Sequence, residues 1–360
     1  TLRTKKSCEI AVIALRPKLG ILTRDPIPLS PRDEDSQLHP VFVPIRYAPK
    51  IGGILNDKLA RKDMERPFLH LIDRFQPDVV LSSWLFPDGC AAAQLCQNDG
   101  LPLVLITQGT DTHGYLNSAI RRRNIMEAVS LSHATICRSG DLAKRLENAG
   151  ADSAKLHVIY NGVDTENFRV RSRSDAQAQL GLNPEAPHFL FVGNLLPVKN
   201  PLFLIQAIQE LNRRRSADDL IPAHLHLIGD GPLRGSIETE IAAQNASEWI
   251  HLHGRKTPTE IACWMSASTR LCLSSHNEGF PNVILEAMSC GLPVISTDVG
   301  GIREKIDRPE RGRLVKPGDL EGYVRALADS ISSPPSKSAL TDEDLGWNYA
   351  ADEYLRVMSR

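Results

Sequence analysis

The stretch from Leu271 to Gly291 reads LCLSSHNEGFPNVILEAMSCG. It opens with a short apolar run, Leu271 to Ser274, of the kind that forms a strand buried on both faces of a sheet. Pro281 suits the first turn of a helix and Gly291 suits its C-cap, so the pattern predicts a helix from Pro281 to Ser289. A strand, a loop and a helix in this order are the repeating unit of a parallel α/β sheet.

Similar apolar runs recur along the chain, with helical stretches between them. Runs of this length and composition are typical of strands in parallel sheets, where ligands bind at the carboxyl ends of the strands. The other expected strands are Ile10–Ala14, Val79–Ser82, Leu103–Thr107, Ala134–Cys137, Leu156–Ile159, Phe189–Val192, Leu225–Ile228, Ile250–Leu252 and Pro293–Ser296.

The length of the chain predicts two domains. Its 360 residues exceed the roughly 100 to 200 of one ordinary domain. Between Asn161 and Pro187 a turn and a polar, proline-containing stretch indicate the linker. A second break, Ser332 to Ser336, precedes a closing helix expected from about residue 342 to Met358, whose apolar stripe is only approximate.

Composition excludes several classes of protein. Apolar residues make up 42% and charged residues 24%, the balance of a globular protein. A formal net charge of −1 gives no overall attraction to nucleic acid. An odd number of cysteines, 7, without a short paired spacing, favours a reducing cytosol over a disulfide framework or a zinc site. No apolar run approaches the ~20 residues that cross a bilayer.

The loop and helix after Ser274 carry the residues with the clearest chemistry. Glu278 lies in the loop before the predicted helix and Glu286 lies inside it. The free N–H groups of a helix start receive anions or hydroxyls, and Gly279 lets a ligand approach the backbone. Each glutamate taken alone also fits a cap or surface residue. Together they indicate a site for sugar hydroxyls at Glu278 and for a ribose at Glu286.

Two further loops of the C-terminal half follow predicted strands. Gly193 and Asn194 begin a turn that ends near Lys199, a cation able to neutralise a diphosphate. Gly229 and Gly231 form a tight turn that brings the backbone close to a base or phosphate. Both features also occur as ordinary loops.

In the N-terminal half, polar residues follow two predicted strands. Trp84 and Asp88 come after the first, and Gln108, Asp111 and His113 come after the second. We expect these loops to face a cleft between the domains. Asp111 and His113 are the groups best placed to meet a sugar, although His113 also fits an exposed loop histidine.

Taken together, these strings resemble the family 4 retaining glycosyltransferases of the GT-B fold. The most specific match is EGFPNVILEAMSCGLPVISTDVGG, from Glu278 to Gly301, which holds the family's pair of glutamates eight positions apart. The order and spacing of the other strings also fit. They are WLFPDG at 84–89, VIYNGVD at 158–164, VGNLLPVKN at 192–200 and IGDGPL at 228–233.

The resemblance implies a fold and a separate role for each domain. It implies two Rossmann-like parallel-sheet domains that face a cleft: residues 1–170 on the acceptor side, and residues 171–340 binding the nucleotide sugar. A closing helix, residues 341–360, would cross back onto the N-terminal domain. The family's opening strand and glycine-rich loop have no counterpart before Glu9. We therefore expect a chain truncated at its start, with a sheet that lacks a central strand.

The resemblance also implies a reaction. A hexosyl group would pass from a UDP- or GDP-linked sugar to a glycan or lipid-linked acceptor with retention of configuration. No cofactor or metal ion is required. The donor would lie on Gly193, Asn194, Lys199, Gly229, Gly231, Glu278, Gly279, Phe280, Pro281, Asn282 and Glu286. The catalytic residues would be Glu278, Asp111 and Lys199, and the acceptor side would hold Trp84, Asp88, Gln108 and His113.

Two departures from the family pattern keep alternatives open. Asn194 stands where the family commonly has arginine, and Gln108 stands where many members have histidine; both side chains still donate hydrogen bonds. A non-catalytic sugar-nucleotide-binding protein is one alternative, and a sugar-nucleotide 2-epimerase, which shares the architecture, is another. Relatives that build polysaccharides on lipid carriers imply a cytoplasmic protein with peripheral membrane contact.

Overall fold

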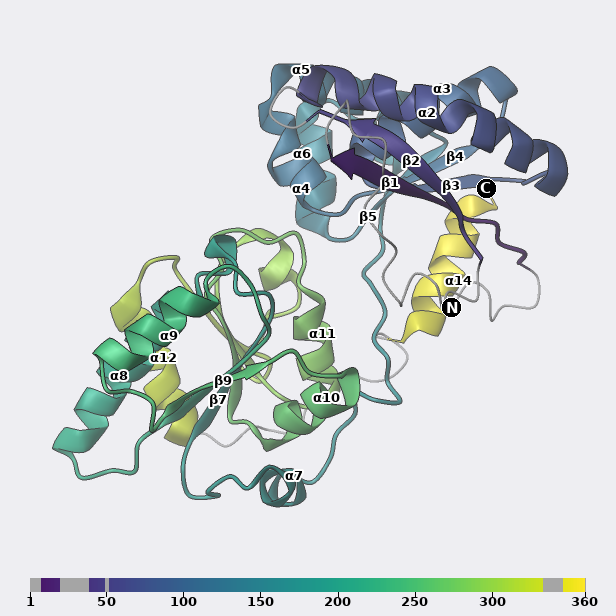
Figure 1. The fold of residues 1–360 in the computed structure, drawn as a ribbon. Coiled ribbons are helices and arrows are strands. Elements are labelled where there is room, and N and C mark those ends of the chain that lie inside the picture. Colours follow the sequence, from purple (N-terminus) through teal and green to yellow (C-terminus); the bar gives the residue numbers. More distant parts are fainter. Residues whose placement is uncertain (1–7, 20–38, 49–51, 333–345, 360) are drawn as a thin grey trace. The chain divides into compact units, whose positions relative to one another are not determined.

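The computed structural model describes residues 8–19, 39–48, 52–332 and 346–359 (Figure 1). The chain forms two compact units. Unit 1 comprises Thr1–Tyr160 with Ala351–Arg360, and unit 2 comprises Asn161–Ala350. Every strand pair described is parallel, which confirms the prediction of two α/β parallel-sheet units.

Unit 1 contains two parallel sheets, one with the order β1-β2 and one with the order β3-β4-β5-β6. Within the described ranges no strand pairing joins them. The residues that precede Cys8 lie outside the described ones, so the expected lack of a central strand stays a prediction. The strands are β1 (Ile13–Leu19), β2 (Val41–Tyr47), β3 (Val80–Ser83), β4 (Leu103–Ile106), β5 (Ala134–Cys137) and β6 (Leu156–Val158).

The prediction for the first strand was wrong in its bounds. It starts at Ile13 rather than Ile10 and runs on to Leu19, paired in register with Val41–Tyr47. Arg16, Pro17 and Lys18 interrupt the apolar run but stay in the strand, and the Arg16 guanidinium lies over the Phe42 ring at 5.4 Å. The partner strand β2 was missed altogether, because proline and arginine also interrupt its apolar pattern.

Helices cover both faces of the larger sheet of unit 1. On one face a buried cluster joins α2, α3, α5 and α6 to the strands. On the other, Tyr354 and Val357 of α14 pack against a cluster that contains Val104 and Ile136. The helices are α2 (Gly52–Phe75), α3 (Cys90–Asp99), α4 (Thr110–His113), α5 (Ala119–Leu131), α6 (Gly140–Ala149) and α14 (Trp347–Met358), with short turns η2 (Leu85–Gly89), η3 (Tyr115–Asn117) and η4 (Ser153–Lys155).

Unit 2 contains one six-stranded sheet with the order β12-β11-β10-β7-β8-β9. The order reverses between β10 and β7, and at such a switch point loops from both halves of a sheet leave a space for a ligand. The strands are β7 (His188–Val192), β8 (His224–Ile228), β9 (Ile250–Gly254), β10 (Arg270–Leu273), β11 (Val294–Thr297) and β12 (Gly312–Val315).

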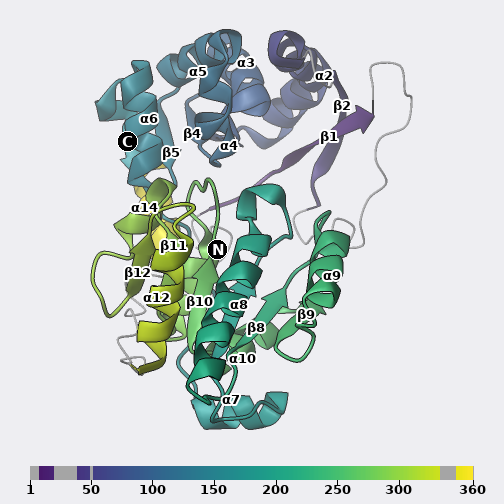
Figure 2. The same ribbon diagram turned by 90° about the vertical axis from the view of Figure 1, so that its left-hand side faces the viewer.

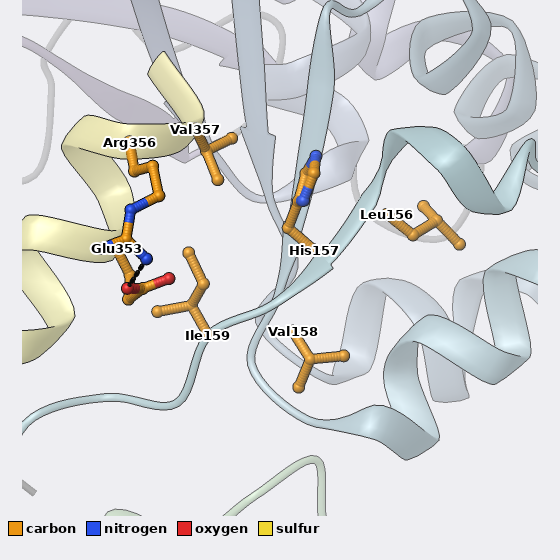
Figure 3. Close-up of a pocket in the computed structure, with 7 residues that line it drawn as sticks. All are labelled: Leu156, His157, Val158, Ile159, Glu353, Arg356 and Val357. Carbon is orange, nitrogen blue, oxygen red and sulfur yellow. Dashed lines mark hydrogen bonds and ion pairs between the residues drawn. The ribbon is translucent and has the colours of Figure 1, made fainter. Parts of the chain in front are cut away.

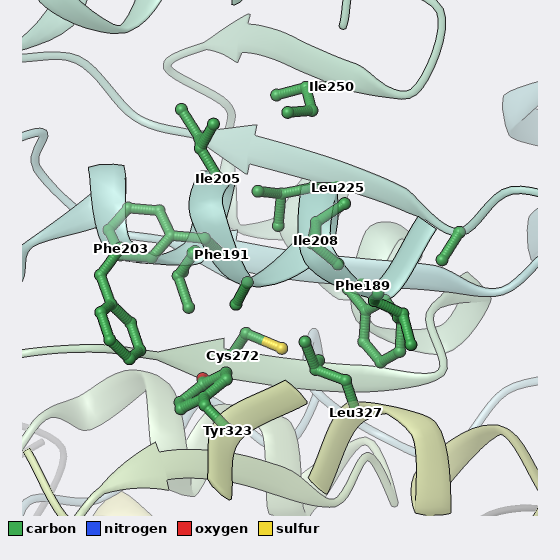
Figure 4. Packing of buried hydrophobic residues seen from close by; sticks show 14 of the residues in the cluster. Phe189, Phe191, Phe203, Ile205, Ile208, Leu225, Ile250, Cys272, Tyr323 and Leu327 are labelled. Atoms are coloured by element: carbon green, nitrogen blue, oxygen red, sulfur yellow. The ribbon is translucent and has the colours of Figure 1, made fainter. Parts of the chain in front are cut away.

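One face of this sheet is covered by α8 and α12, which lie side by side over the strands (Figure 2). Phe189, Phe191 and Tyr323 lie fully buried in the hydrophobic cluster that joins the strands to these helices (Figure 4). The Tyr323 hydroxyl lies 3.1 Å from the Leu273 carbonyl oxygen and 3.0 Å from that of Ile295, so its burial leaves no polar group unsatisfied.

The other face of the sheet packs against a second cluster, in which Trp264 and Leu285 belong to α10 and α11. The helices of unit 2 are α7 (Arg173–Leu180), α8 (Pro201–Ala217), α9 (Arg234–Ala243), α10 (Pro258–Ala267), α11 (Asn282–Ser289) and α12 (Leu320–Ser332), with turns η5 (Pro197–Lys199) and η6 (Gly300–Glu304). Helix α11 begins one residue later than predicted, because Pro281 occupies its N-cap. Of the break predicted from Ser332 to Ser336, Ser332 is the last residue of α12; the rest of this break and the expected start of the closing helix, residues 342–345, lie outside the described residues.

Candidate active site

Lys199 and Glu278 meet at the carboxyl edge of the unit 2 sheet. The Nζ of Lys199 lies 2.5 Å from Oε1 of Glu278, and the Ser275 hydroxyl donates to the same oxygen at 2.6 Å. Glu278 is 9% exposed and the Lys199 side chain is 25% exposed. The two charges predicted for the sugar and for the diphosphate therefore form one partly buried ion pair, which bridges the switch point of the sheet.

Backbone contacts fix the two loops that carry this pair. Ser274, which follows β10, donates its hydroxyl hydrogen to the carbonyl oxygens of Lys199 and Asn200, at 3.0 and 2.8 Å. The His276 N–H donates to the Val198 carbonyl oxygen at 2.8 Å. Because strand ends hold both loops, the ion pair needs little further ordering when a ligand arrives.

The glycine turns after β7 and β8 pack backbone against backbone. The Leu195 N–H donates to the Asp230 carbonyl oxygen at 3.0 Å. Gly229 has a φ of +140°, and a Cβ there would lie 1.9 Å from the Gly193 carbonyl oxygen. A Cβ at Gly231 would lie 2.7 Å from the Leu195 carbonyl oxygen. Only glycine fits these positions, so the exposed Asn194 sits on a rigid double turn.

A third loop supports Glu278 from the other side. The Gly301 N–H donates to the Gly279 carbonyl oxygen at 3.1 Å. Gly300 has a φ of +55°, and a Cβ there would lie 1.8 Å from the Glu278 carbonyl oxygen. This glycine pair ends the string from Glu278 to Gly301 that resembles the family, but no role was predicted for it from the sequence. The signal was the doubled glycine in the loop that follows the predicted strand Pro293–Ser296.

The start of α11 keeps its backbone donors available. Pro281 occupies the N-cap and makes no side-chain capping bond, so the first N–H groups of the helix are not taken by a cap. Asn161, which begins unit 2, donates from Nδ2 to Oδ1 of Asn282 at 2.7 Å. Sequence reasoning placed Asn161 only in a turn; the structure assigns it to orienting Asn282.

Glu286 lies one to two turns further along α11. It is half-buried, and burial raises the pKa of its carboxyl to about 6. No side-chain hydrogen bond or ion pair links it to another described residue. The Glu286 carboxylate can therefore still accept hydrogen bonds, and its half-buried position suits a ligand that supplies hydroxyl donors.

The loops of unit 1 are organised around Asp111. Its side chain is fully buried, and its carboxylate accepts the N–H groups of Leu85 at 3.1 Å, Gln108 at 3.0 Å and Gly109 at 2.8 Å. Burial raises the pKa of this carboxyl, and the backbone hydrogen bonds oppose that rise. Asp111 therefore joins the loop after β3 to the loop after β4.

The other unit 1 residues take different positions. Trp84 is 39% exposed, and Gln108 beside it donates to the Ser83 hydroxyl. Asp88 is half-buried, and burial raises the pKa of its carboxyl to about 6. The His113 side chain is only 4% exposed and lies 3.3 Å from Asp141, so it is not the exposed loop histidine that the sequence also allowed.

Two family models match the chain. The model described as Glycosyl transferases group 1 matches residues 172–344, and the model described as Glycosyltransferase Family 4 matches residues 20–167. The chain belongs to glycosyltransferase family 4. The glycine turns and the Lys199–Glu278 pair described above all lie within the first of these matches.

Curated relatives carry related names. An uncharacterized glycosyltransferase of Methanocaldococcus jannaschii is 32% identical over 256 residues, which are 70% of this chain and 66% of that protein. The D-inositol 3-phosphate glycosyltransferase of Rhodococcus erythropolis is 29% identical over 249 residues, 66% of this chain and 56% of that protein. The matches thus span between about half and two thirds of these relatives' own length.

Solved structures show the same fold at low identity. HepE of Anabaena, solved in complex with UDP, has a TM-score of 0.71 at 19% identity and covers 89% of this chain and 86% of its own. Sucrose-phosphate synthase of Thermosynechococcus elongatus has a TM-score of 0.73 at 19% identity, and the match covers 96% of this chain and 88% of the synthase chain. The family member described here therefore has the GT-B fold that its sequence resembles.

A surface cavity of about 250 Å³ lies elsewhere, between β6 and α14 of unit 1 (Figure 3). Glu353 and Arg356 form an ion pair at its wall. None of the residues predicted for the site lines it. The lining residues are Leu156, His157, Val158, Ile159, Glu353, Arg356 and Val357. No described helix is long and apolar enough to span a membrane.

Proposed function

We propose that this family 4 glycosyltransferase transfers a hexosyl group from a UDP- or GDP-linked sugar to a hydroxyl of a glycan or lipid-linked acceptor, with retention of configuration. The observation that carries the proposal is the Lys199–Glu278 ion pair on loops whose close packing requires glycine. A structure of similar fold that holds UDP supports a nucleotide-linked donor.

The donor would replace contacts that the site now makes with itself. In the proposal, the Lys199 ammonium turns to the diphosphate, and the Glu278 carboxylate accepts hydrogen bonds from sugar hydroxyls. The backbone from Gly279 to Asn282 supports the sugar, and Glu286 accepts the ribose hydroxyls. Charge-assisted hydrogen bonds are about twice as strong as neutral ones. The bonds from Lys199 and Glu278 to the donor can therefore replace the bond between these two side chains.

The chemistry would rest on positioning and charge stabilisation. The bond between the anomeric carbon and the diphosphate breaks, and the acceptor oxygen attacks the same face. The leaving phosphate oxygen takes the proton of the acceptor hydroxyl, so the step balances without a dedicated base, a metal ion or a cofactor. Lys199 and the N–H groups at the start of α11 stabilise the negative charge that develops on the diphosphate.

On the acceptor side, Asp111 becomes a positioning residue in our proposal. Its carboxylate has no exposed surface, and three backbone N–H groups already use it. It would hold Trp84, Asp88 and Gln108 in the arrangement that meets the acceptor. His113 would help to order the same loop through Asp141. For a lipid-linked acceptor, the protein would act in the cytoplasm at the membrane surface.

The proposal is tested by a screen of UDP- and GDP-sugars against the complete chain. Thermal shift identifies the donor, and the product analysis that follows separates three functions. A glycosyltransferase releases the nucleotide diphosphate when glycan, lipid-linked or polyol phosphate acceptors are added. An epimerase changes the sugar of the donor, and a non-catalytic protein leaves the donor intact. The proposal fails if no nucleotide sugar raises the melting temperature, or if the bound donor is never consumed.

A further inference from the structure

Five histidines gather on one face of the unit 2 sheet, on three neighbouring strands. His188 comes from β7, His224 and His226 from β8, and His251 and His253 from β9. Strand register places His188 beside His224, and His226 beside His251. His188 and His226 are each 2% exposed, and the other three are half-buried.

Three of these rings form a continuous chain of hydrogen bonds. Nε2 of His188 lies 2.9 Å from the Asn183 carbonyl oxygen, and its Nδ1 lies 3.0 Å from Nε2 of His226. Nδ1 of His226 lies 3.0 Å from Nε2 of His253. A separate pair joins Nδ1 of His224 to Nε2 of His251 at 3.2 Å. We call the chain from Asn183 to His253 the histidine ladder.

The ladder fixes where its protons lie when its rings are neutral. A carbonyl oxygen only accepts, so Nε2 of His188 carries a proton and its Nδ1 accepts. His226 must then donate from Nε2 and accept at Nδ1, and His253 must donate from Nε2. All three rings are therefore Nε2–H tautomers. The ladder can take up one proton without losing a hydrogen bond. A second proton would place two N–H groups opposite each other, and one hydrogen bond between rings would be lost.

The surroundings oppose added protons. Burial and, to a smaller extent, neighbouring histidines lower the pKa of His226 to about 2 and that of His253 to about 4. Burial also lowers the pKa of His188, and Arg173 of α7 contributes to this shift; Lys256 contributes to the shift of His253. Glu248 acts in the other sense, on His224. Trp264 of α10 covers the rings, with centroids 4.6 Å from His226 and 4.3 Å from His253.

The outer end of the ladder adjoins a donor turn. Gly254 directly follows His253, and its carbonyl oxygen accepts the Gly229 N–H at 2.8 Å. Gly229 is the glycine that packs against Gly193. Register between β8 and β9 shifts at this point, between Leu227 and Ile228, so the strand edge there is held by fewer regular bonds.

We propose that the histidine ladder is a pH-sensitive latch: its neutral rings hold β8, β9 and the Gly229 turn together, and mild acid shifts the equilibrium toward an open form in which the rings take up protons. The nitrogen contacts within the ladder are hydrogen bonds. Within the described residues, no group of three or more histidine, cysteine, aspartate or glutamate side chains is arranged to hold a metal ion. The latch does not depend on the proposed transfer reaction.

The sign of the effect follows from linkage. A histidine whose pKa is depressed in the closed state stabilises that state above its ordinary pKa and loses this contribution as the pH falls. Consider a ring that stays neutral in the closed form of the latch but has its ordinary pKa in the open form. Lowering the pH from 7.5 to 5.5 then shifts the equilibrium toward the open form by about tenfold for each such ring. The shift is reversible on return to neutral pH.

Hydrogen exchange of the complete chain at pH 7.5 and 5.5, corrected for intrinsic exchange rates, tests the latch without any donor. Peptides covering β8, β9 and residues 229–233 should lose at least about tenfold protection at the lower pH. His226→Phe keeps a ring but removes the centre of the ladder, and His253→Gln keeps a donor that cannot titrate. Both should reduce this acid-induced loss. His70→Gln, on the exposed surface of α2, should not.

Histidine nitrogen chemical shifts provide a second readout in case His226→Phe does not fold. At pH 7.5 the wild-type spectrum should contain three Nε2–H tautomers assigned to the ladder, still neutral at pH 5.5. The latch is overturned if His226 is an Nδ1–H tautomer or titrates near 6.5. It is also overturned if the His253→Gln protein loses as much protection in acid as the His70→Gln control.

Discussion

The ammonium of Lys199 and the carboxylate of Glu278 lie 2.5 Å apart, although they come from loops 79 positions apart in the sequence. The pair lies where the order of the unit 2 sheet reverses, between β7 and β10. In the proposed reaction each partner leaves the other for the donor. The pair thus keeps two charges in place, and partly shielded from water, until the donor supplies their ligands.

Removal of the lysine should damage transfer more than folding. Lys199→Ala leaves the 25% exposed site without the charge proposed for the diphosphate. We expect kcat/KM to fall by about 100-fold or more, the scale found for single groups that stabilise developing charge. The melting temperature should change by little, because partly exposed ion pairs contribute only about 0–1 kcal/mol. Lys256→Ala, at a lysine just before α10 whose side chain is 30% exposed, is the control; equal losses in both variants would contradict the assigned role.

Glu286 predicts a pH dependence of donor binding. Its carboxyl pKa of about 6 means that the acceptor form dominates only above that value. If ribose hydroxyls donate to the carboxylate, donor affinity should be full above pH 7 and fall by up to tenfold per unit below pH 6. Calorimetric titration across this range checks the slope. Glu286→Gln should bind more weakly at pH 7.5 and with a flat profile; a slope that persists in it would contradict the prediction.

The same carboxyl should cost stability at neutral pH. A carboxyl whose folded pKa is raised stabilises the fold below its unfolded pKa, and this contribution is lost as the pH rises through about 6. The shift corresponds to roughly 2 kcal/mol. Without a donor, Glu286→Gln should therefore raise the free energy of unfolding at pH 7.5 by up to that amount, and not at pH 4. Denaturant titrations at both values measure it, and equal changes at both would refute the cause.

Asp111 should be more important for structure than a surface aspartate. Asp111→Asn replaces one acceptor oxygen by an NH₂ group that faces backbone donors. We expect a loss of about 2–4 kcal/mol in the free energy of unfolding of unit 1. Asp99→Asn, at the exposed end of α3, should cost less than about 0.5 kcal/mol. A variant at 111 with wild-type stability and reduced kcat would instead favour a catalytic role for the carboxylate.

The glycine turns offer a matched steric test. Gly229→Ala would place a Cβ 1.9 Å from the Gly193 carbonyl oxygen. Gly181→Ala, in the same unit and also at positive φ, would meet nothing within 4 Å. The control should cost about 1 kcal/mol of backbone strain. Gly229→Ala should cost clearly more and weaken donor binding. Similar stabilities for the two variants would show that the turns can separate.

The sequence was informative where chemistry and periodicity coincide. The strand, loop and helix around Glu278 were predicted within one residue at most ends, because a buried apolar run, a proline and a glycine mark every boundary. Strands β2 and β12 were missed, because edge strands admit proline, arginine and glycine among their apolar residues. Their pairing depends on distant partners that no local pattern records.

Side-chain partnerships were the hardest features to predict. The sequence placed Lys199 and Glu278 in one site but gave no sign that they contact each other. Asp111 was expected to meet a substrate, yet its carboxylate faces three N–H groups supplied by two loops. The histidine ladder was not predicted at all. Its members lie at alternate positions of three strands, so only the register of the sheet brings them together.

The proposed donor site is tested most directly by calorimetric titration of the complete chain with UDP- and GDP-sugars. Glu278→Ala is compared with Glu185→Ala, a change at an exposed glutamate of the same unit. We expect saturable binding of at least one nucleotide sugar to the wild-type and Glu185→Ala proteins, weakened by at least tenfold in Glu278→Ala. Absence of binding by the wild type, or equal affinities in the two variants, would contradict a donor site built on Lys199 and Glu278.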